Sequence, residues 1–358
     1  MNSTLFKIFD LQDDANRLAQ LKRKEATKDE SGNLLSAAQT LRFVIEQGQY
    51  ADSLGIDFFN VGEHHRDDFS VSAPDIVLAG LATTTKKIIL GTGVTVLSSD
   101  DPIRVYQRFA TIDALSNGRA EITAGRGSFI ESFPLFGYDL NDYSVLFEEK
   151  LSLLVEALKE KPINWSGTTR APLVNQEVFP KTESGRIPLR VGVGGTPESV
   201  VRAARLGANL ALAIIGGDPA RFAAFSQLYI QALEKFGKPK LSIAIHSPGH
   251  VSDSDEQAVE ELWPSYFASF GRIGKERGWG PLTKEHFMNE VKHGSVYAGS
   301  PETVARKIAY AIRSVGADRF DFKYANGPMK QSQIMNSIKL YATKVIPIVR
   351  EELGAKAS

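Results

Sequence analysis

Two adjacent histidines in a charged loop are the residues of this chain best suited to move protons. His64 and His65 follow a glutamate in the segment EHHRDD, directly after an aromatic and β-branched run at residues 58–61. An imidazole changes charge near neutral pH, so such a pair could act in acid–base chemistry or bind a metal. A Ser-Pro-Gly segment separates His246 from His250 and prevents a shared helix face. We therefore favour proton transfer over a metal site, with an inert surface pair as the alternative.

A glycine turn between a predicted strand and a predicted helix is suited to bind an anion. Gly194, Gly195 and Thr196 follow the run at 189–193 and precede a helical pattern at 197–206. Such a turn offers backbone N–H groups and the positive end of a helix, where a phosphate binds well. A tight turn that needs glycine only for its backbone angles is the equal alternative.

Arg126 is the second candidate for anion binding. It lies between Gly125 and Gly127, where the run at 120–124 ends. A guanidinium can make a forked contact to a phosphate, although a salt bridge within the loop is an equal alternative. Gly93 and Val94 lie inside another strand pattern, where glycine often marks a bulge or the close approach of a ligand.

The elements that must position these residues alternate between strand and helix along the chain. This alternation predicts a parallel sheet with crossover helices. Eight such units favour a (β/α)8 barrel over an open sheet, because no dinucleotide-type glycine turn follows the first strand. The catalytic residues of such barrels lie where the strands end. The predicted strands are 5–9, 58–61, 88–96, 120–124, 189–193, 210–214, 241–246 and 319–323, and the helices are 38–54, 73–83, 102–115, 143–160, 197–206, 219–236, 255–270, 301–315 and 331–349.

Three segments interrupt this rhythm inside what we expect to be a single domain over residues 1–358. Residues 11–37 are polar and charged, residues 162–187 suggest a small hairpin, and residues 271–298 are glycine-rich. Long irregular segments in a compact barrel are often lids or binding loops. We therefore expect residues 11–37 and 271–298 to shape the substrate pocket.

Composition excludes several classes of protein. The 358 residues carry 42 Lys+Arg and 42 Asp+Glu, so the basic excess typical of a general nucleic-acid binder is missing. There is no cysteine, which excludes disulfides, thiolate metal sites and cysteine nucleophiles. The sequence has neither a signal-peptide pattern nor about 18 consecutive apolar residues. We expect a cytoplasmic protein that contacts neither membrane nor nucleic acid.

Several blocks together resemble the bacterial luciferase-like flavin-dependent monooxygenases. They are the EHH segment, the run from LGTGVTVL to FGYDL, the run PLRVGVGGTPESVVRAARLGANLAL, and the later segments GSPETVARKI and GADRFDF. The similarity covers roughly residues 38–250 and 295–350 in matching order. It implies the same barrel fold, with flavin mononucleotide (FMN) bound at the mouth formed by the strand ends.

The resemblance also assigns roles to residues. It implies that Arg126 reaches the flavin phosphate and that Gly194, Gly195 and Thr196 form the phosphate turn. It implies a cis peptide bond between Gly93 and Val94 behind the flavin ring, and that His64 takes part in the flavin–oxygen chemistry.

The activity that this resemblance implies is oxygenation of a small organic substrate with O2 and reduced FMN. A separate flavin reductase would supply the reduced cofactor, since the sequence has no second dinucleotide-binding pattern. The family usually forms dimers, so we expect a homodimer. The alternatives are hydride transfer with a deazaflavin cofactor and a flavin-binding barrel without catalysis.

Overall fold

Parallel strands form one curled sheet at the centre of this computed structural model, which describes residues 27–127 and 129–354. The strands pair in the order β1, β2, β4, β7, β8 and β9; β3 also pairs with β4, and β10 and β11 both pair with β9. All these pairings are parallel. The strands are β1 (Phe58–Val61), β2 (Ile89–Thr92), β3 (Thr95–Val96), β4 (Ala120–Gly125), β7 (Leu189–Val193), β8 (Asn209–Ala213), β9 (Ile243–Val251), β10 (Tyr297–Gly299) and β11 (Arg319–Lys323).

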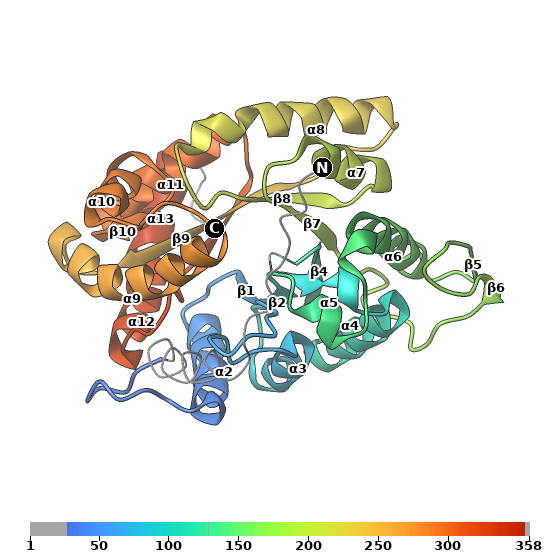
Figure 1. The fold of residues 1–358 in the computed structure, drawn as a ribbon, viewed down its shortest axis with the longest axis horizontal. Helices are drawn as coiled ribbons and strands as arrows, with labels where there is room; N and C mark the ends of the chain where they lie inside the picture. The colour runs from blue at the N-terminus through green and yellow to red at the C-terminus, as the bar shows by residue number, and fades with distance from the viewer. Residues whose placement is uncertain (1–26, 128, 355–358) are drawn as a thin grey trace, which may run out of the picture.

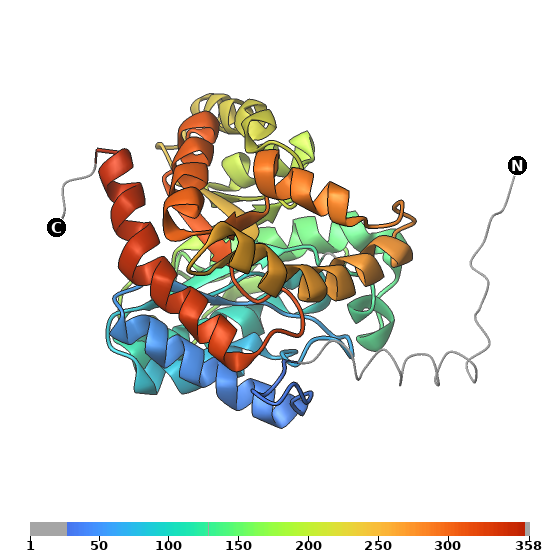
Figure 2. The ribbon, with the colours of Figure 1, turned by 90° about the vertical axis from the view of Figure 1, so that its left-hand side faces the viewer.

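Helices surround this sheet, as Figure 1 shows. The α-helices are α2 (Ala37–Ser53), α3 (Pro74–Thr84), α4 (Pro102–Ser116), α5 (Ser132–Leu135), α6 (Tyr143–Ala157), α7 (Pro197–Leu206), α8 (Ala223–Lys235), α9 (Asp255–Glu276), α10 (Lys284–His293), α11 (Pro301–Val315), α12 (Gln331–Leu340) and α13 (Ile346–Glu352). Shorter helical turns are η1 (Leu97–Ser99), η2 (Leu140–Asp142), η3 (Pro219–Phe222) and η4 (Tyr341–Val345). Figure 2 shows α12, η4 and α13 as one long run beside α2. This is the helix-wrapped, curled parallel sheet of a TIM-type barrel.

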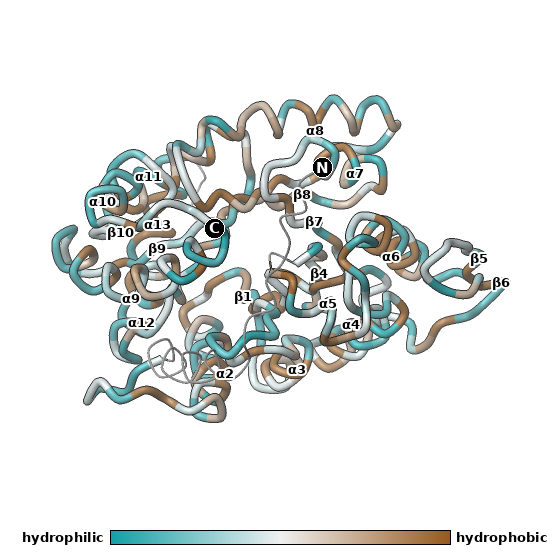
Figure 3. The backbone as a smooth tube through the Cα atoms, in the orientation of Figure 1, coloured by the Kyte–Doolittle hydropathy of each residue, from teal (hydrophilic) through white to brown (hydrophobic). Residues whose placement is uncertain are grey.

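Side chains alternate between the two faces of the sheet, and this sets what the barrel encloses. One face carries aliphatic residues that are fully buried against the helices, such as Leu90, Val191 and Leu212. Figure 3 shows this hydrophobic character along β8. The other face points into the barrel, because Arg319 on β11 reaches across to Glu121 on β4 at 2.7 Å between Nη1 and Oε1.

The strand predictions at 58–61, 189–193 and 319–323 coincide with β1, β7 and β11. The predicted strand at 88–96 is divided into β2 and β3, with a bend at Gly93 and Val94 between them. The predicted strand at 5–9 lies outside the described residues, as does most of the segment 11–37.

The expected hairpin within residues 162–187 is confirmed. β5 (Ile163–Trp165) and β6 (Leu173–Gln176) pair antiparallel and project from the barrel at one side of Figure 1.

The expectation of an irregular segment over residues 271–298 is wrong. α9 continues to Glu276, and α10 and β10 occupy much of the remainder. Glycine is costly inside a helix, at about 1 kcal/mol, yet Gly274 lies within α9 and is buried beside Trp279. The helix therefore continues through a glycine, although the composition alone suggests a loop.

Candidate active site at the strand ends

Glycines line the inner face of the barrel where several strands end. Residues paired across two parallel strands point to the same face of the sheet. Glu121 points inward, and the register pairs it with Gly91 on β2. Thr123, two residues further along β4, also points inward and is paired with Arg190 on β7. Continuing the alternation places Gly62, Gly93, Gly125, Gly192 and Gly194 on this inner face. Gly93 is exposed, although the flanking β2 and β3 are largely buried. Among these five glycines, only Gly194 has nothing within 4 Å of an added Cβ, so the inner face is open there and closely packed at the other four.

The predicted cis peptide bond between Gly93 and Val94 is present. The Val94 side chain lies against the inner faces of β4 and β7. A Cβ added to Gly125 would lie 2.5 Å from Val94 Cγ2, and one added to Gly192 would lie 3.0 Å from Val94 Cγ1. These two glycines therefore make room for Val94.

His64 lies beside this inner face, since a Cβ added to Gly62 would lie 3.9 Å from His64 Nε2. Its ring centroid lies 4.0 Å from that of Phe69 and 5.1 Å from that of Phe129. Burial, followed by the positive charge of Lys323, lowers the pKa of His64 from 6.5 to about 3. The imidazole is therefore neutral at physiological pH and can accept a proton or a hydrogen bond.

Glu63 holds the loop that carries His64. Its Oε2 accepts a hydrogen bond from the Val96 backbone N–H at 2.8 Å, and its Oε1 lies 2.9 Å from His65 Nε2. The carboxyl is buried, and this burial raises its pKa. Glu63 thus links the end of β1 to β3, a positioning role that the sequence alone did not reveal.

Arg126 lies where β4 ends, beside an aromatic ring. Its guanidinium carbon is 5.0 Å from the centre of the Tyr143 ring, and the Tyr143 hydroxyl donates to the Gly127 carbonyl oxygen at 3.1 Å. Arg126 has no ion-pair partner within residues 27–127 and 129–354. Tyr143, which no sequence pattern singled out, therefore supports a cation whose charge is not neutralised by that part of the chain.

The turn at Gly194, Gly195 and Thr196 is open. Nothing lies within 4 Å of a Cβ added to either glycine, and Gly195 has a φ of +118°, which favours glycine. No side chain caps the first N–H groups of α7, because the Thr196 hydroxyl donates to Ser199 Oγ at 2.7 Å instead. Since β4 and β7 are neighbours, this turn and Arg126 lie at adjacent strand ends.

An ion-pair network joins the His64 loop to the end of α9. Arg66 contacts Glu276 at 2.7 Å and Asp68 at 2.9 Å, and Arg272 contacts Asp67 at 2.8 Å. The Arg66 guanidinium also lies 4.3 Å from the centre of the Phe129 ring. The network fixes α9 beside the candidate site, in the segment that the sequence suggested to be irregular.

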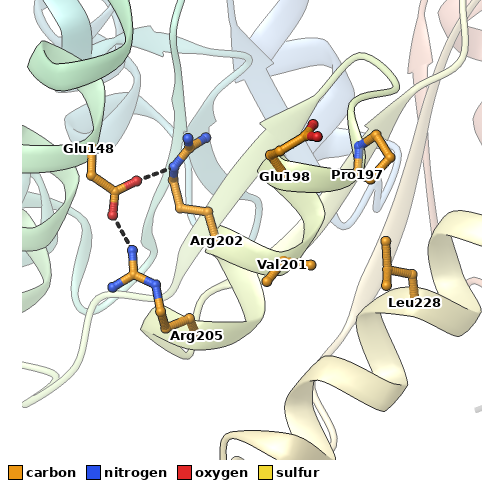
Figure 4. A pocket seen from close by; sticks show the side chains of 7 residues that line it. All are labelled: Glu148, Pro197, Glu198, Val201, Arg202, Arg205 and Leu228. Atoms are coloured by element: carbon orange, nitrogen blue, oxygen red, sulfur yellow. Dashed lines mark hydrogen bonds and ion pairs between the residues drawn. The ribbon is translucent and has the colours of Figure 1, made fainter.

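A groove of about 420 Å³ lies behind the glycine turn, between α6, α7 and α8. Figure 4 shows Glu148 bridging Arg202 and Arg205 there, with Pro197 and Leu228 on the far side. Both guanidinium groups are thus paired, and the groove lies on the helices rather than in the barrel. We do not include it in the candidate site.

Among the described residues, no group of three His, Asp or Glu side chains is arranged to hold a metal ion. No described helix is long and apolar enough to cross a membrane.

A TIM-type barrel with polar groups and open glycine turns where its strands end has the architecture of a barrel enzyme. The chain belongs to the luciferase-like monooxygenase family, whose model matches residues 25–319. The oxygenase component of the flavin-dependent trigonelline monooxygenase of Acinetobacter baylyi is 26% identical over 86% of this chain and 89% of that protein. For several other curated relatives, this chain spans only about half of their length or less.

Solved structures share the fold. The oxygenating constituent of 3,6-diketocamphane monooxygenase from Pseudomonas putida, a type II Baeyer–Villiger enzyme in complex with FMN, superposes with a TM-score of 0.72. It is 18% identical, and the match covers 91% of this chain and 98% of that one. The coenzyme F420-dependent tetrahydromethanopterin reductase of Methanopyrus kandleri has a TM-score of 0.68 at 17% identity, covering 91% and 99%. At these identities the likeness concerns the fold alone.

Proposed function

We propose that this protein is an FMN-dependent monooxygenase that oxygenates a small organic substrate with O2. The observation that carries the proposal is the set of features at neighbouring strand ends: a glycine-rich inner face, a neutral His64, an Arg126 without an ion-pair partner in the described residues, and the open turn before α7. A flat ring suits the glycine-rich face, and a phosphate suits the cation and the uncapped helix start.

In this proposal Arg126 and the N–H groups of Gly195 and Thr196 hold the phosphate. Gly93 and Val94 lie behind the ring. Bound reduced FMN supplies the electrons that activate O2, and the protein must exclude water and orient the substrate. The lowered pKa keeps the His64 imidazole neutral, so it donates one hydrogen bond and accepts another at its two ring nitrogens.

A separate reductase is the partner we propose. The described residues contain no second nucleotide-binding domain, and the Acinetobacter relative is named as an oxygenase component. We further propose that the protein is a homodimer in the cytoplasm. Light scattering of the purified protein measures its mass in solution and so tests the dimer.

Oxygen uptake with photoreduced FMN and a panel of organic substrates tests the activity. Release of hydrogen peroxide alone, with no oxygenated product from any substrate, would count against a monooxygenase. His64→Ala should abolish product formation while FMN affinity is nearly kept, whereas His286→Ala, at an exposed site on α10, should change neither. Unchanged turnover in His64→Ala would remove His64 from the mechanism.

A deazaflavin-dependent hydride transfer is the second candidate, favoured by the fold shared with the F420-dependent reductase. Fluorescence titrations with reduced FMN and with reduced F420 separate the two, because they differ in the cofactor that binds tightly. Tight binding of oxidised FMN without turnover would instead indicate a flavin-binding barrel.

A further inference from the structure

β11 carries three charged side chains on the inner face of the barrel, at Arg319, Asp321 and Lys323. The first two neutralise each other, since Arg319 Nε lies 2.6 Å from Asp321 Oδ1, and Arg319 also pairs with Glu121. Lys323 is the last of the row, level with Pro248 at the mouth. Its ammonium forms neither a hydrogen bond nor an ion pair within residues 27–127 and 129–354.

The groups that face Lys323 provide no counter-charge. Its positive charge lowers the pKa of His64 on the β1 loop and of His246 on β9, although burial is the larger cause for both. The Phe270 ring of α9 lies 5.4 Å from its Nζ. Asp321 on its own strand is paired with Arg319. Burial lowers the pKa of Lys323 itself to about 8, so the ammonium is charged at neutral pH but poorly solvated.

We propose that Lys323 binds the carboxylate of the substrate and thereby holds the substrate beside His64. This proposal rests on the proposed function, since it names the substrate class of the same site: small organic monoanions. A half-buried cation without a charged partner is stabilised by an anion that enters the site. A single ammonium that acts on two neutral imidazoles suits one negative charge better than the two charges of a phosphate. The imidazole of His246 can donate a second hydrogen bond to the same group.

Calorimetric titration with benzoate and with its neutral analogue benzamide tests this proposal. The full-length protein is titrated both with and without FMN. For wild type we expect benzoate to bind more tightly than benzamide. Lys323→Met should weaken benzoate by about 10- to 150-fold, the range of one charge-assisted hydrogen bond. Benzamide should bind all variants alike, and the exposed Lys339→Met on α12 should behave as wild type.

The pH profile separates a direct contact from a merely structural role. Benzoate binding to wild type should weaken about tenfold per pH unit above about 8, where Lys323 loses its proton. Lys323→Arg should bind benzoate up to a higher pH than wild type. Lys323→Met should bind benzoate weakly, and its affinity should not fall above pH 8. Equal affinity of wild type and Lys323→Met for benzoate, or a wild-type preference for benzamide, would overturn the proposal. Failure to bind FMN would overturn the proposed function instead, and the flavin-free titration would still decide the role of Lys323.

Discussion

Replacing Arg126 tests the placement of the phosphate most directly. Arg126 lies at the end of β4, next to the open turn at the end of β7, and it has no ion-pair partner in the described part of the chain. In our proposal the phosphate of FMN is its counter-ion. Arg126→Ala should therefore weaken FMN, which carries the phosphate, and leave riboflavin, which lacks it, nearly unchanged.

The size of this effect follows from the contacts of the guanidinium. A charge-assisted hydrogen bond contributes about 1.5–3 kcal/mol, which is about 10- to 150-fold in the dissociation constant. The substitution also removes the contact with the Tyr143 ring, at 5.0 Å, which contributes about 0.5–1 kcal/mol at a partly exposed site. That contact is already present in the free protein, so its loss lowers the stability of the fold and leaves the ratio of the two affinities to report the phosphate contact.

Flavin fluorescence titrations at one fixed ionic strength measure both dissociation constants. Arg126→Lys should give an intermediate loss for FMN, because it keeps the charge but not the forked geometry. Arg186→Ala, at an exposed position before β7, serves as the matched control and should change neither affinity. Equal losses for FMN and riboflavin in Arg126→Ala would refute the reasoning, since Arg126 would then act on the ring or on folding.

Three further predictions concern His64, Glu63 and Lys150, a buried lysine of α6 whose Nζ donates to the Ser98 carbonyl oxygen at 2.7 Å. Because the pKa of His64 is about 3, kcat measured between about pH 5 and 8 should show no limb near 6.5, and a limb that disappears in His64→Gln would contradict this. Glu63→Ala leaves the buried N–H of Val96 without its acceptor and should cost about 2–3 kcal/mol in urea unfolding, while Glu63→Gln, which keeps an acceptor oxygen, should cost less. Burial lowers the pKa of Lys150 from 10.5 to about 8, so the unfolded chain binds more protons in that window and the free energy of unfolding should rise with pH there. Lys150→Met should reduce this slope by up to about 1.4 kcal/mol per pH unit, and an equal reduction in the exposed Lys159→Met would argue against this origin.

The order of strands and helices could be predicted from the sequence because local patterns determine it. Residues 197–206 and 301–315 carry proline at the helix start and are followed by glycines with φ of 70° and 73°. Such signals lie within a few residues of the boundary that they specify. The positions of His64 and Arg126 at the mouth followed from the same logic, since each comes directly after a predicted strand.

The remaining features depend on contacts between distant parts of the chain. The network of Arg66 with Glu276 joins residues 210 positions apart, and no local pattern indicates that separation. Lys323 ends a strand of charged and aromatic residues, and only the register with β9 shows that it points inward. The part of α9 beyond residue 270 is held by long-range ion pairs of Arg272 with Asp67 and of Glu276 with Arg66, which the local low helix propensity of glycine does not reveal.

The inner face of the barrel is more polar on one side than on the other. This difference determines which side each proposed ligand occupies. Small residues face inward at the ends of β1, β2, β4 and β7, whereas His246, Asp321 and Lys323 face inward from β9 and β11. A flat ring needs the close approach to the backbone that glycine permits. A charged substrate group needs a cation, and the attraction between the two charges is stronger where the surroundings are less polar. If the ring occupies the first side, the substrate must lie between the ring and β11, with Lys323 behind it. His64 then borders both ligands from the β1 loop, where a neutral imidazole can hold the proton that the reaction between them exchanges.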